Sequence, residues 1–216
     1  MTTYQYGDFA NLLAYFSVNI WLDWMQEDTG RTGAGEDIST DEWDPVWRGE
    51  ITLDQRLTHA QAAAVDAMIA GLNGVIGRFY MYDPRLPFPI KDPNGTILGS
   101  TTVRILDINA NRNRIQVKNL PNHYWLSCGD RFHVEFGTDP VHRGYHWIRT
   151  DIQADNTGAT DWIDIAPHLP TGVNVNDEIV LRRPSPLWRF EAKSVRTGAG
   201  QGQLTPGATF RMVQVF

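Results

Sequence analysis

The sequence predicts a mainly β protein with one helix, in an α+β arrangement. Three observations predict it. Apolar and polar residues alternate in several segments, a single segment has a helix-capping pattern, and a proline-rich stretch separates two β-rich regions. We expect an N-terminal β-sheet or sandwich domain that carries the helix, followed by a small β-barrel of the OB or SH3-like type. A composition of 42% hydrophobic and 20% charged residues suits a globular chain with a core.

The strands are predicted from side chains that alternate between apolar and polar. In residues 16–22 the apolar side chains recur at every second position, so they share one face of an extended chain. The same period of two recurs in three further segments: 47–53, 132–136 and 210–216. Each segment is therefore expected to form a strand with one buried face.

A single helix is predicted over residues 59–71. Thr58 and Gln61 form a capping box, in which each side chain can satisfy the exposed backbone amide of the other residue. Apolar residues then recur with helical spacing on one face: Val65, Met68, Ile69 and Leu72. Gly71 or Gly74 can end the helix in a left-handed turn.

Residues 83–95 contain four prolines and predict a connector between two β units, because proline interrupts both helices and strand ladders. We therefore place one domain at residues 1–90 together with 187–216, and a second domain at 91–186. Short strands separated by turns are expected in the second domain, near 101–108, 114–119, 130–136, 145–153, 159–166 and 178–183. Such a series of short strands is typical of a small barrel or sandwich.

Charge and cysteine content disfavour several classes of protein. The net charge of −6 disfavours a broad phosphate-binding surface, so no specific nucleic acid partner is expected. The single cysteine, Cys128, cannot form an internal disulfide. No basic residues precede an apolar run at the start, and no window has the roughly 18 apolar residues of a membrane span. We expect a soluble protein made in a cytoplasm, with no membrane partner.

Three histidines, His133, His142 and His146, lie close in sequence and could converge as metal ligands on paired strands. Their spacing matches none of the helix-borne zinc motifs, so strand-surface or hydrogen-bonded histidines are the favoured interpretation. Cys128 and His123 could act as a nucleophile and its base, but a packed thiol near a turn is favoured. We therefore expect no catalytic residue, no metal and no cofactor, and a protein that is not an enzyme.

An acidic segment at residues 36–44 holds five carboxylates: Glu36, Asp37, Asp41, Glu42 and Asp44. Two of them could serve acid and base catalysis as in a glycosidase. Such pairs need separate and specifically held positions, whereas a clustered run in a loop is usually solvated. The segment could also line a channel and repel DNA. The solvated loop is the favoured interpretation.

Short motifs that occur in order along the chain carry a family resemblance. In the first domain they are Trp47–Leu53, the helix ending Ile69–Gly74, Gly77–Phe79 and Asp83–Pro84. Further along they are Leu126–Asp130, Trp147–Arg149, Ala154–Thr160, Ile165–Pro167, Trp188–Phe190 and the strand at Phe210. This set resembles the distal tail proteins of long-tailed (siphovirus-type) bacteriophages. The acidic segment at 36–44 and the histidine-rich strand at 142–147 depart from the pattern, which leaves the receptor side and any added activity open.

The resemblance implies a structural virion protein. Such proteins resemble the tail-tube subunit and form a six-fold ring at the end of the tail tube. The ring joins the tube protein to the tail hub with its tape measure, and to tail fibres or receptor-binding proteins. Assembly takes place in the host cytoplasm, the protein ends in the tail tip of the virion, and genomic DNA would pass through the ring. No catalytic residue carries over, and a closed ring of heterologous interfaces suits aromatic and arginine anchors.

Subunit contacts are expected at two edge strands of the first domain, 9–22 and 208–216, because an unpaired ladder can recruit a strand of another chain. The last strand is expected to return to the sheet of the first domain. The candidate interface residues are Phe16, Val18, Trp47, Phe210 and Met212.

A carbohydrate-binding β module on a tail or cell surface is the alternative function. Its exposed aromatic rings would stack on sugars, and the candidate platform is Tyr124, Trp125, Tyr145 and Trp147. A metallo-hydrolase that uses the three histidines is a third hypothesis.

Overall fold

The computed structural model describes all residues except 1, 6–15, 32, 42, 55 and 206–207. The chain divides into two compact units. Unit 1 is built mainly from Leu12–Arg78 and Trp188–Gln214, and unit 2 mainly from Phe79–Leu187. The chain therefore enters unit 2 before the proline-rich stretch, whereas the sequence places the boundary at residues 90 and 91.

The proline-rich stretch belongs to unit 2 because it is tied to the barrel by hydrogen bonds. The backbone N–H of Ile90 donates to Asp130 Oδ1 at 2.7 Å, and the N–H of Leu98 donates to Asp92 Oδ2 at 2.9 Å. Both aspartates are buried. A segment that cannot join a strand ladder thus packs through its polar contacts.

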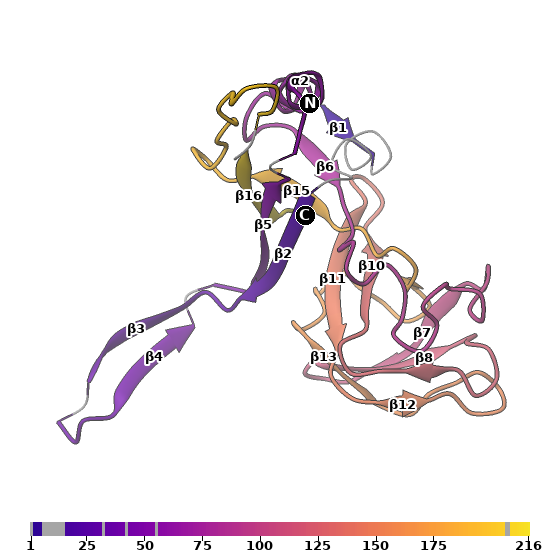
Figure 1. The fold of residues 1–216 in the computed structure, drawn as a ribbon. Helices are drawn as coiled ribbons and strands as arrows, with labels where there is room; N and C mark the ends of the chain where they lie inside the picture. Colours follow the sequence, from indigo (N-terminus) through magenta and orange to yellow (C-terminus); the bar gives the residue numbers. More distant parts are fainter. Residues whose placement is uncertain (1, 6–15, 32, 42, 55, 206–207) are drawn as a thin grey trace. The chain divides into compact units, whose positions relative to one another are not determined.

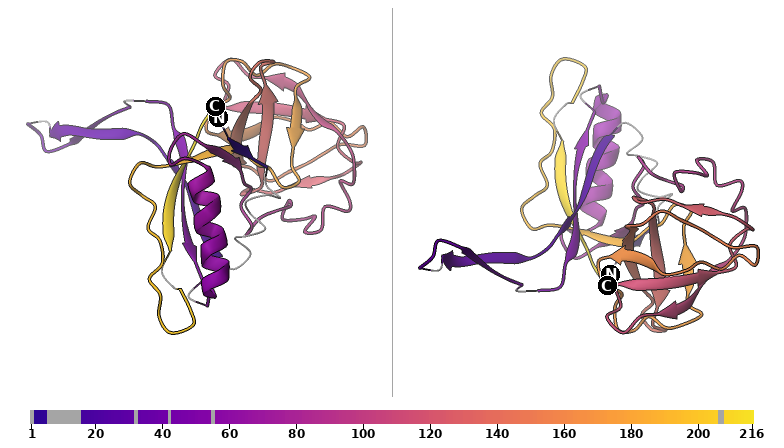
Figure 2. Two further views of the ribbon diagram at one scale, coloured as in Figure 1. Left: turned by 90° about the horizontal axis from the view of Figure 1, so that it is seen from above. Right: turned by 90° about the horizontal axis from the view of Figure 1, so that it is seen from below.

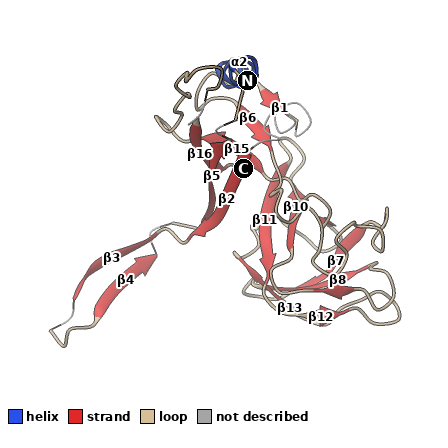
Figure 3. Ribbon diagram, in the orientation of Figure 1, coloured by secondary structure: helices blue, strands red, loops and turns tan. Residues whose placement is uncertain are grey.

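Strands dominate the secondary structure, as Figure 3 shows, and the predicted mainly β class is confirmed. The strands and the helix that begin in the first part of the chain are β1 (Thr3–Tyr4), β2 (Phe16–Asp23), β3 (Gln26–Arg31), β4 (Asp37–Asp41), β5 (Val46–Leu53), α2 (His59–Gly71) and β6 (Arg78–Tyr80). The next strands are β7 (Val103–Ile108), β8 (Arg114–Lys118), β9 (Trp125–Leu126), β10 (Arg131–Phe136), β11 (His142–Ile148), β12 (Ile152–Gln153), β13 (Ile163–Ala166) and β14 (Glu178–Val180). The last two are β15 (Leu187–Phe190) and β16 (Thr209–Gln214).

Unit 1 contains a sheet whose strands β15, β16, β5 and β2 pair in that order. All eight residues of β2 pair with β5 in antiparallel register, from Phe16 opposite Leu53 to Asp23 opposite Val46. The expected alternation holds, since Val18 and Ile20 are buried and Ser17 and Asn19 are exposed. The sheet therefore has a buried face and an outer, polar face.

Helix α2 lies alongside β5 and β16 in both views of Figure 2. Its capping box is formed as predicted: the side chain of Thr58 accepts from the backbone N–H of Gln61, whose side chain accepts from the N–H of Thr58 at 3.0 Å. Val65 and Leu72 are buried, which confirms the predicted apolar face. After the helix, Asn73 and Gly74 take positive φ angles of 52° and 67°. The helix therefore ends in a left-handed turn at Gly74, one of the two predicted glycines.

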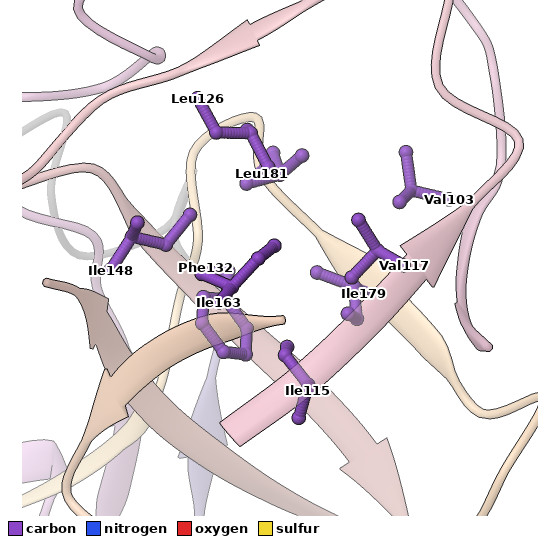
Figure 4. A pocket seen from close by; sticks show the side chains of 9 residues that line it. All are labelled: Val103, Ile115, Val117, Leu126, Phe132, Ile148, Ile163, Ile179 and Leu181. Carbon is purple, nitrogen blue, oxygen red and sulfur yellow. The ribbon is translucent and has the colours of Figure 1, made fainter. Parts of the chain in front are cut away.

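Unit 2 is a closed six-stranded barrel with the order β10-β11-β13-β8-β7-β14, which confirms the predicted small barrel. Its core consists mainly of aliphatic residues, together with Phe132 and Tyr124. Figure 4 shows nine of these side chains around a residual cavity: Val103, Ile115, Val117, Leu126, Phe132, Ile148, Ile163, Ile179 and Leu181. The cavity holds about 10 Å³, the lower limit for one water, and its lining is apolar. The barrel interior is thus a packed core with no room for a ligand.

Candidate functional site

The hairpin of β2 and β5 continues into a second two-stranded ribbon, β3 paired with β4, which extends away from the sheet of unit 1 (Figure 1). All six residues of β3 are exposed. A two-stranded ribbon with no covered face is at best marginally stable in water. We therefore treat the ribbon, residues 26–41, as the first part of the candidate site.

The base of the ribbon is held by Arg48. Its Nε donates to Asp23 Oδ2 at 2.6 Å, and its Nη1 donates to Glu191. Met25, which has a positive φ of 53°, donates its backbone N–H to Asp23 Oδ1 at 3.1 Å. These bonds fix the point where the chain leaves the sheet, so the ribbon begins from an ordered anchor.

Two tryptophans flank the ribbon at this base. Trp24 is 50% exposed and Trp43 is 70% exposed, and Ile38 within the ribbon is 44% exposed. Large exposed apolar side chains gathered in one segment are typical of contact surfaces. The sequence reasoning missed both tryptophans, although each stands outside the alternating pattern of the neighbouring strands and next to acidic residues.

Among the strands that the structure describes, β2 is an edge of the sheet, as expected for residues 16–22, whereas residues 9–15 lie outside the described part of the chain. Strand β16, in contrast, is not an edge strand, because it pairs with β15 on one side and β5 on the other. The prediction of a free ladder at 208–216 is therefore wrong. The apolar alternation of that segment is what a central strand of this sheet needs.

The proposed interface residues are mostly core residues. Trp47 and Met212 are 0% exposed, and Val18 and Phe210 are also buried, while the side chain of Phe16 lies outside the described set. They point to the covered face of the sheet. These four buried side chains pack in the core of unit 1, so they are not available to contact another subunit.

The aromatic residues of the carbohydrate alternative are not brought together on a surface. Tyr124 and Tyr145 are buried, Trp125 is 38% exposed, and Trp147 is partly covered. Burial and the charges of Asp92 and Asp130 raise the pKa of Tyr124, and its hydroxyl lies 3.4 Å from Asp92 Oδ2. Tyr124 and Tyr145 therefore pack inside unit 2 and leave Trp125 without a neighbouring exposed ring from the candidate set.

The three histidines lie in separate environments on β10 and β11. His133 Nδ1 accepts the backbone N–H of Ser185 at 3.0 Å, and burial lowers its pKa. His146 Nδ1 is 3.0 Å from the carbonyl of Pro167 and therefore donates, and its ring stacks on Phe132 at 5.2 Å. His142 packs beside Phe136. Within the described residues, no group of three or more His, Cys, Asp or Glu side chains is placed to hold a metal ion.

Cys128 and the acidic segment occupy the surface. Cys128 is exposed, so the expectation of a packed thiol is wrong: it lies in the turn before β10, where its backbone N–H donates to Asp151 Oδ1 at 2.8 Å. The ends of the acidic segment are also exposed, with Glu36 at the tip of the ribbon and Asp44 at its base. The solvated interpretation of these two residues therefore agrees with their placement.

Unit 2 has a buried polar cluster on the outer face of its barrel. The side chain of Asp83 is fully buried and receives hydrogen bonds from Arg85, at 2.7 Å from Nη2, and from Arg131. Arg131 lies over the rings of Tyr145 and Trp147, at 6.0 and 5.6 Å from their centroids. Burial alone would raise the pKa of Asp83, but the bonds from Arg85 and the charge of Arg131 outweigh it and hold that pKa below its usual value. Asp83 and Arg131 are enclosed and form a structural pair, while Arg85 caps the pair from the exposed side.

Comparison with known proteins gives no identification: no family model matches the chain, and no curated protein is a recognisable relative in sequence. Within the described residues, the structure has no helix that is both long and apolar enough to cross a membrane. The candidate site is therefore defined by the geometry of unit 1 alone.

Proposed function

We propose that this chain is a structural, non-enzymatic subunit of a ring at the tail tip of a long-tailed bacteriophage, a distal tail protein. The observation that carries the proposal is the hairpin of β2 to β5, which combines an open sheet edge with a ribbon that projects into solvent. The motif resemblance described above supplies the class of assembly, and the hairpin supplies the means of contact.

The hairpin adds little stability to a monomer, because its outer edge and its ribbon are not covered by described residues. Edge strands present unpaired backbone donors and acceptors that recruit another chain, and proteins that stay monomeric usually blunt them. Here the exposed outer residues of β2 include Ser17 and Asn19, with no lysine or proline along the strand. Trp24 and Trp43 add exposed apolar area next to the same edge. Both features favour a subunit of an assembly.

The partners follow from this role. The subunit would contact further copies of itself in a ring of six, the tail tube protein on one side, and the tail hub with its tape measure and the fibres or receptor-binding protein on the other. Genomic DNA would pass through the ring without sequence-specific contact. The protein would reside in the tail tip of the virion after assembly in the host cytoplasm.

The carbohydrate-binding alternative has less support. A sugar platform needs exposed, neighbouring rings, and Tyr124 and Tyr145 are both buried. The metallo-hydrolase hypothesis needs converging imidazoles, and His133 and His146 each use a ring nitrogen on a different backbone group.

Native mass spectrometry across a concentration series tests the proposal. A discrete hexamer, or a trimer able to stack, is the expected result. Asn19→Lys places a charge on the edge strand and should weaken the assembly, whereas Asn122→Lys, at an exposed position of unit 2, is the matched control and should leave it intact. A strict monomer at every concentration, with and without tail tube protein, would overturn the proposal.

A further inference from the structure

The net charge of the chain is concentrated in one segment. Residues 24–45, which contain the ribbon and its base, hold seven acidic residues and one arginine, a net charge of −6. This equals the net charge of the whole chain, so the remaining residues balance, with 18 basic and 18 acidic side chains. A strongly acidic arm on a neutral body would be attracted to a basic surface.

The acidic side chains of the ribbon are exposed on both of its faces. Glu27 and Asp28 are consecutive in β3, so they point to opposite faces of the ribbon. Neither makes an ion pair within the described residues, whereas Asp37 pairs with Arg31 at 2.6 Å. Whichever face of the ribbon meets a partner, it presents an uncompensated carboxylate.

A complementary row of arginines lies on the outer face of the sheet in unit 1. Arg189 of β15 pairs with Val213 of β16, and Arg211 lies two residues before Val213 on β16. Arg196 pairs with Thr209, two residues before Arg211. Because alternate residues of a strand share a face, all three arginines belong to the outer face, about 7 Å apart along the strand. All three are exposed, and the Arg211 side chain is 60% exposed.

The row is only partly neutralised within its own chain. Glu50 lies 3.7 Å from Arg211, and Glu191 is engaged by Arg48 at the base of the ribbon. Arg189 and Arg196 make no ion pair among the residues that the structure describes. The arginine row therefore carries positive charge that is not neutralised by the described residues, as the ribbon carries negative charge.

The ribbon of the same chain points away from this row. It leaves the sheet where Asp23 pairs with Val46, and the row extends in the other direction along β5, from the position of Arg48 to that of Thr52. The six residues of β3 span about 20 Å beyond the sheet. A second copy of the chain can bring the two surfaces together without reversing the hairpin.

We propose that the acidic ribbon 26–41 of one copy docks on the arginine row Arg189, Arg196 and Arg211 of the next copy. This proposal rests on the proposed ring and deepens it, because it names the contact that links neighbours. The contact is heterologous: two different surfaces meet, and each copy both gives a ribbon and receives one. Repetition of such a contact closes into a ring when the rotation between copies fits.

A charge-swap experiment on the full chain tests the contact. The ribbon variant is Glu27→Lys with Asp28→Lys, and the row variant is Arg189→Glu with Arg211→Glu. Each alone should weaken assembly about tenfold by native mass spectrometry and analytical ultracentrifugation, because attraction becomes repulsion. An equimolar mixture of the two variants should recover assembly, since each ribbon then meets a row of opposite charge.

The controls separate this contact from general charge effects and from misfolding. Asp161→Lys with Glu178→Lys makes the same change in net charge as the ribbon variant, but on exposed positions of unit 2, and should assemble like the unmodified chain. Circular dichroism and thermal unfolding should match for all variants. Assembly of the unmodified chain should weaken as salt rises from 50 to 500 mM, because the contact is electrostatic.

The outcomes distinguish the two proposals. If the unmodified chain forms a ring and both variants assemble equally well, the docking contact is overturned and the ring stands. If each variant fails but their mixture does not recover, the ribbon docks elsewhere, for instance on another tail protein, and the contact is again overturned. If the unmodified chain stays monomeric throughout, the ring proposal fails and the contact fails with it.

Discussion

Two outer strand faces of the molecule carry arginines and carboxylates in the same alternating pattern, but one face is buried and the other is exposed to solvent. In unit 2, the outer face of β10 and β11 holds Arg131 in a covered cluster with Asp83. In unit 1, the outer face of β15 and β16 holds Arg189 and Arg211, which are exposed. A polar strand face is therefore not a sign of solvent exposure.

The difference comes from what covers each face. In unit 2, the chain's own segment at residues 83–85 brings a carboxylate and a second guanidinium to the barrel, and Ser185 reaches His133. The charges of Asp83 and Arg131 are thereby paired and removed from water. In unit 1 no described segment covers the arginine row, so its charges remain available to a partner. Burial without a partner is costly, and exposure without a partner is not.

Asp83→Ala should have the largest effect on stability. It removes the carboxylate that pairs with buried Arg131 and leaves that guanidinium without its charge partner, which costs about 3 to 5 kcal/mol in buried pairs. Urea unfolding monitored by tryptophan fluorescence measures the loss. Asp28→Ala in the exposed ribbon is the matched control and should change the free energy of unfolding by no more than about 0.5 kcal/mol. Equal effects of the two changes would contradict the comparison.

Acidification should also destabilise the barrel of unit 2, where His146 packs beside the core residue Phe132. Burial lowers the pKa of His146 to about 4 from a usual value of 6.5. Between these pH values His146 binds a proton in the unfolded chain but not in the folded protein. Its full contribution to the free energy of unfolding is therefore present above about pH 7 and is lost as the pH drops from 6.5 to 4. The full difference corresponds to about 3 kcal/mol. His133 is shifted in the same direction and adds to the loss.

Unfolding free energies at pH 7.5 and 4.5 measure this dependence. His146→Asn keeps a donor toward the carbonyl of Pro167 but does not titrate, so its loss between the two pH values should be smaller by about 2 kcal/mol. A variant whose stability falls as steeply as that of the unmodified chain would show that His146 is not the responsible group.

The buried face of the unit 1 sheet gives an intermediate effect. A Cβ added at Gly49 would lie 2.4 Å from Met212 Cε and 3.2 Å from the backbone oxygen of Asn19. Gly49→Ala should therefore cost about 1 to 3 kcal/mol, as overpacked cores do. Gly33→Ala at the ribbon tip has nothing within 4 Å of the added atom and should be nearly neutral. Thermal unfolding of the two variants gives the contrast directly.

Much of the fold could be predicted because it depends on local pattern. The capping box of Thr58 and Gln61 set the start of the helix, and the alternation at 132–136 marked a barrel strand. The position of residues 208–216 within the sheet could not be predicted in this way. Alternation states which face is buried but does not state how many neighbours a strand has, and β16 has two.

The candidate site was harder to predict, because exposed elements leave a weak pattern. The ribbon residues 26–31 have no apolar period, so nothing marks them as a strand except their pairing with β4. Conversely, Trp47 and Met212 are large apolar residues in a predicted strand, and that property fits a core position as well as an interface. Only the tertiary structure separates these two interpretations.

Arg31→Ala should have the smallest effect on the free energy of unfolding, and it tests directly the difference between an exposed ion pair and a buried one. Arg31 pairs with Asp37 at 2.6 Å, close to the 2.7 Å between Arg85 and Asp83, but the side chains of Arg31 and Asp37 are 73% and 54% exposed. Solvent screens such a pair, so its loss should change the free energy of unfolding by less than about 1 kcal/mol. If ribbon docking is electrostatic, the same change makes the arm more acidic and should strengthen assembly slightly at low salt. Weaker assembly of Arg31→Ala would instead show that the order of the ribbon tip matters more than its charge.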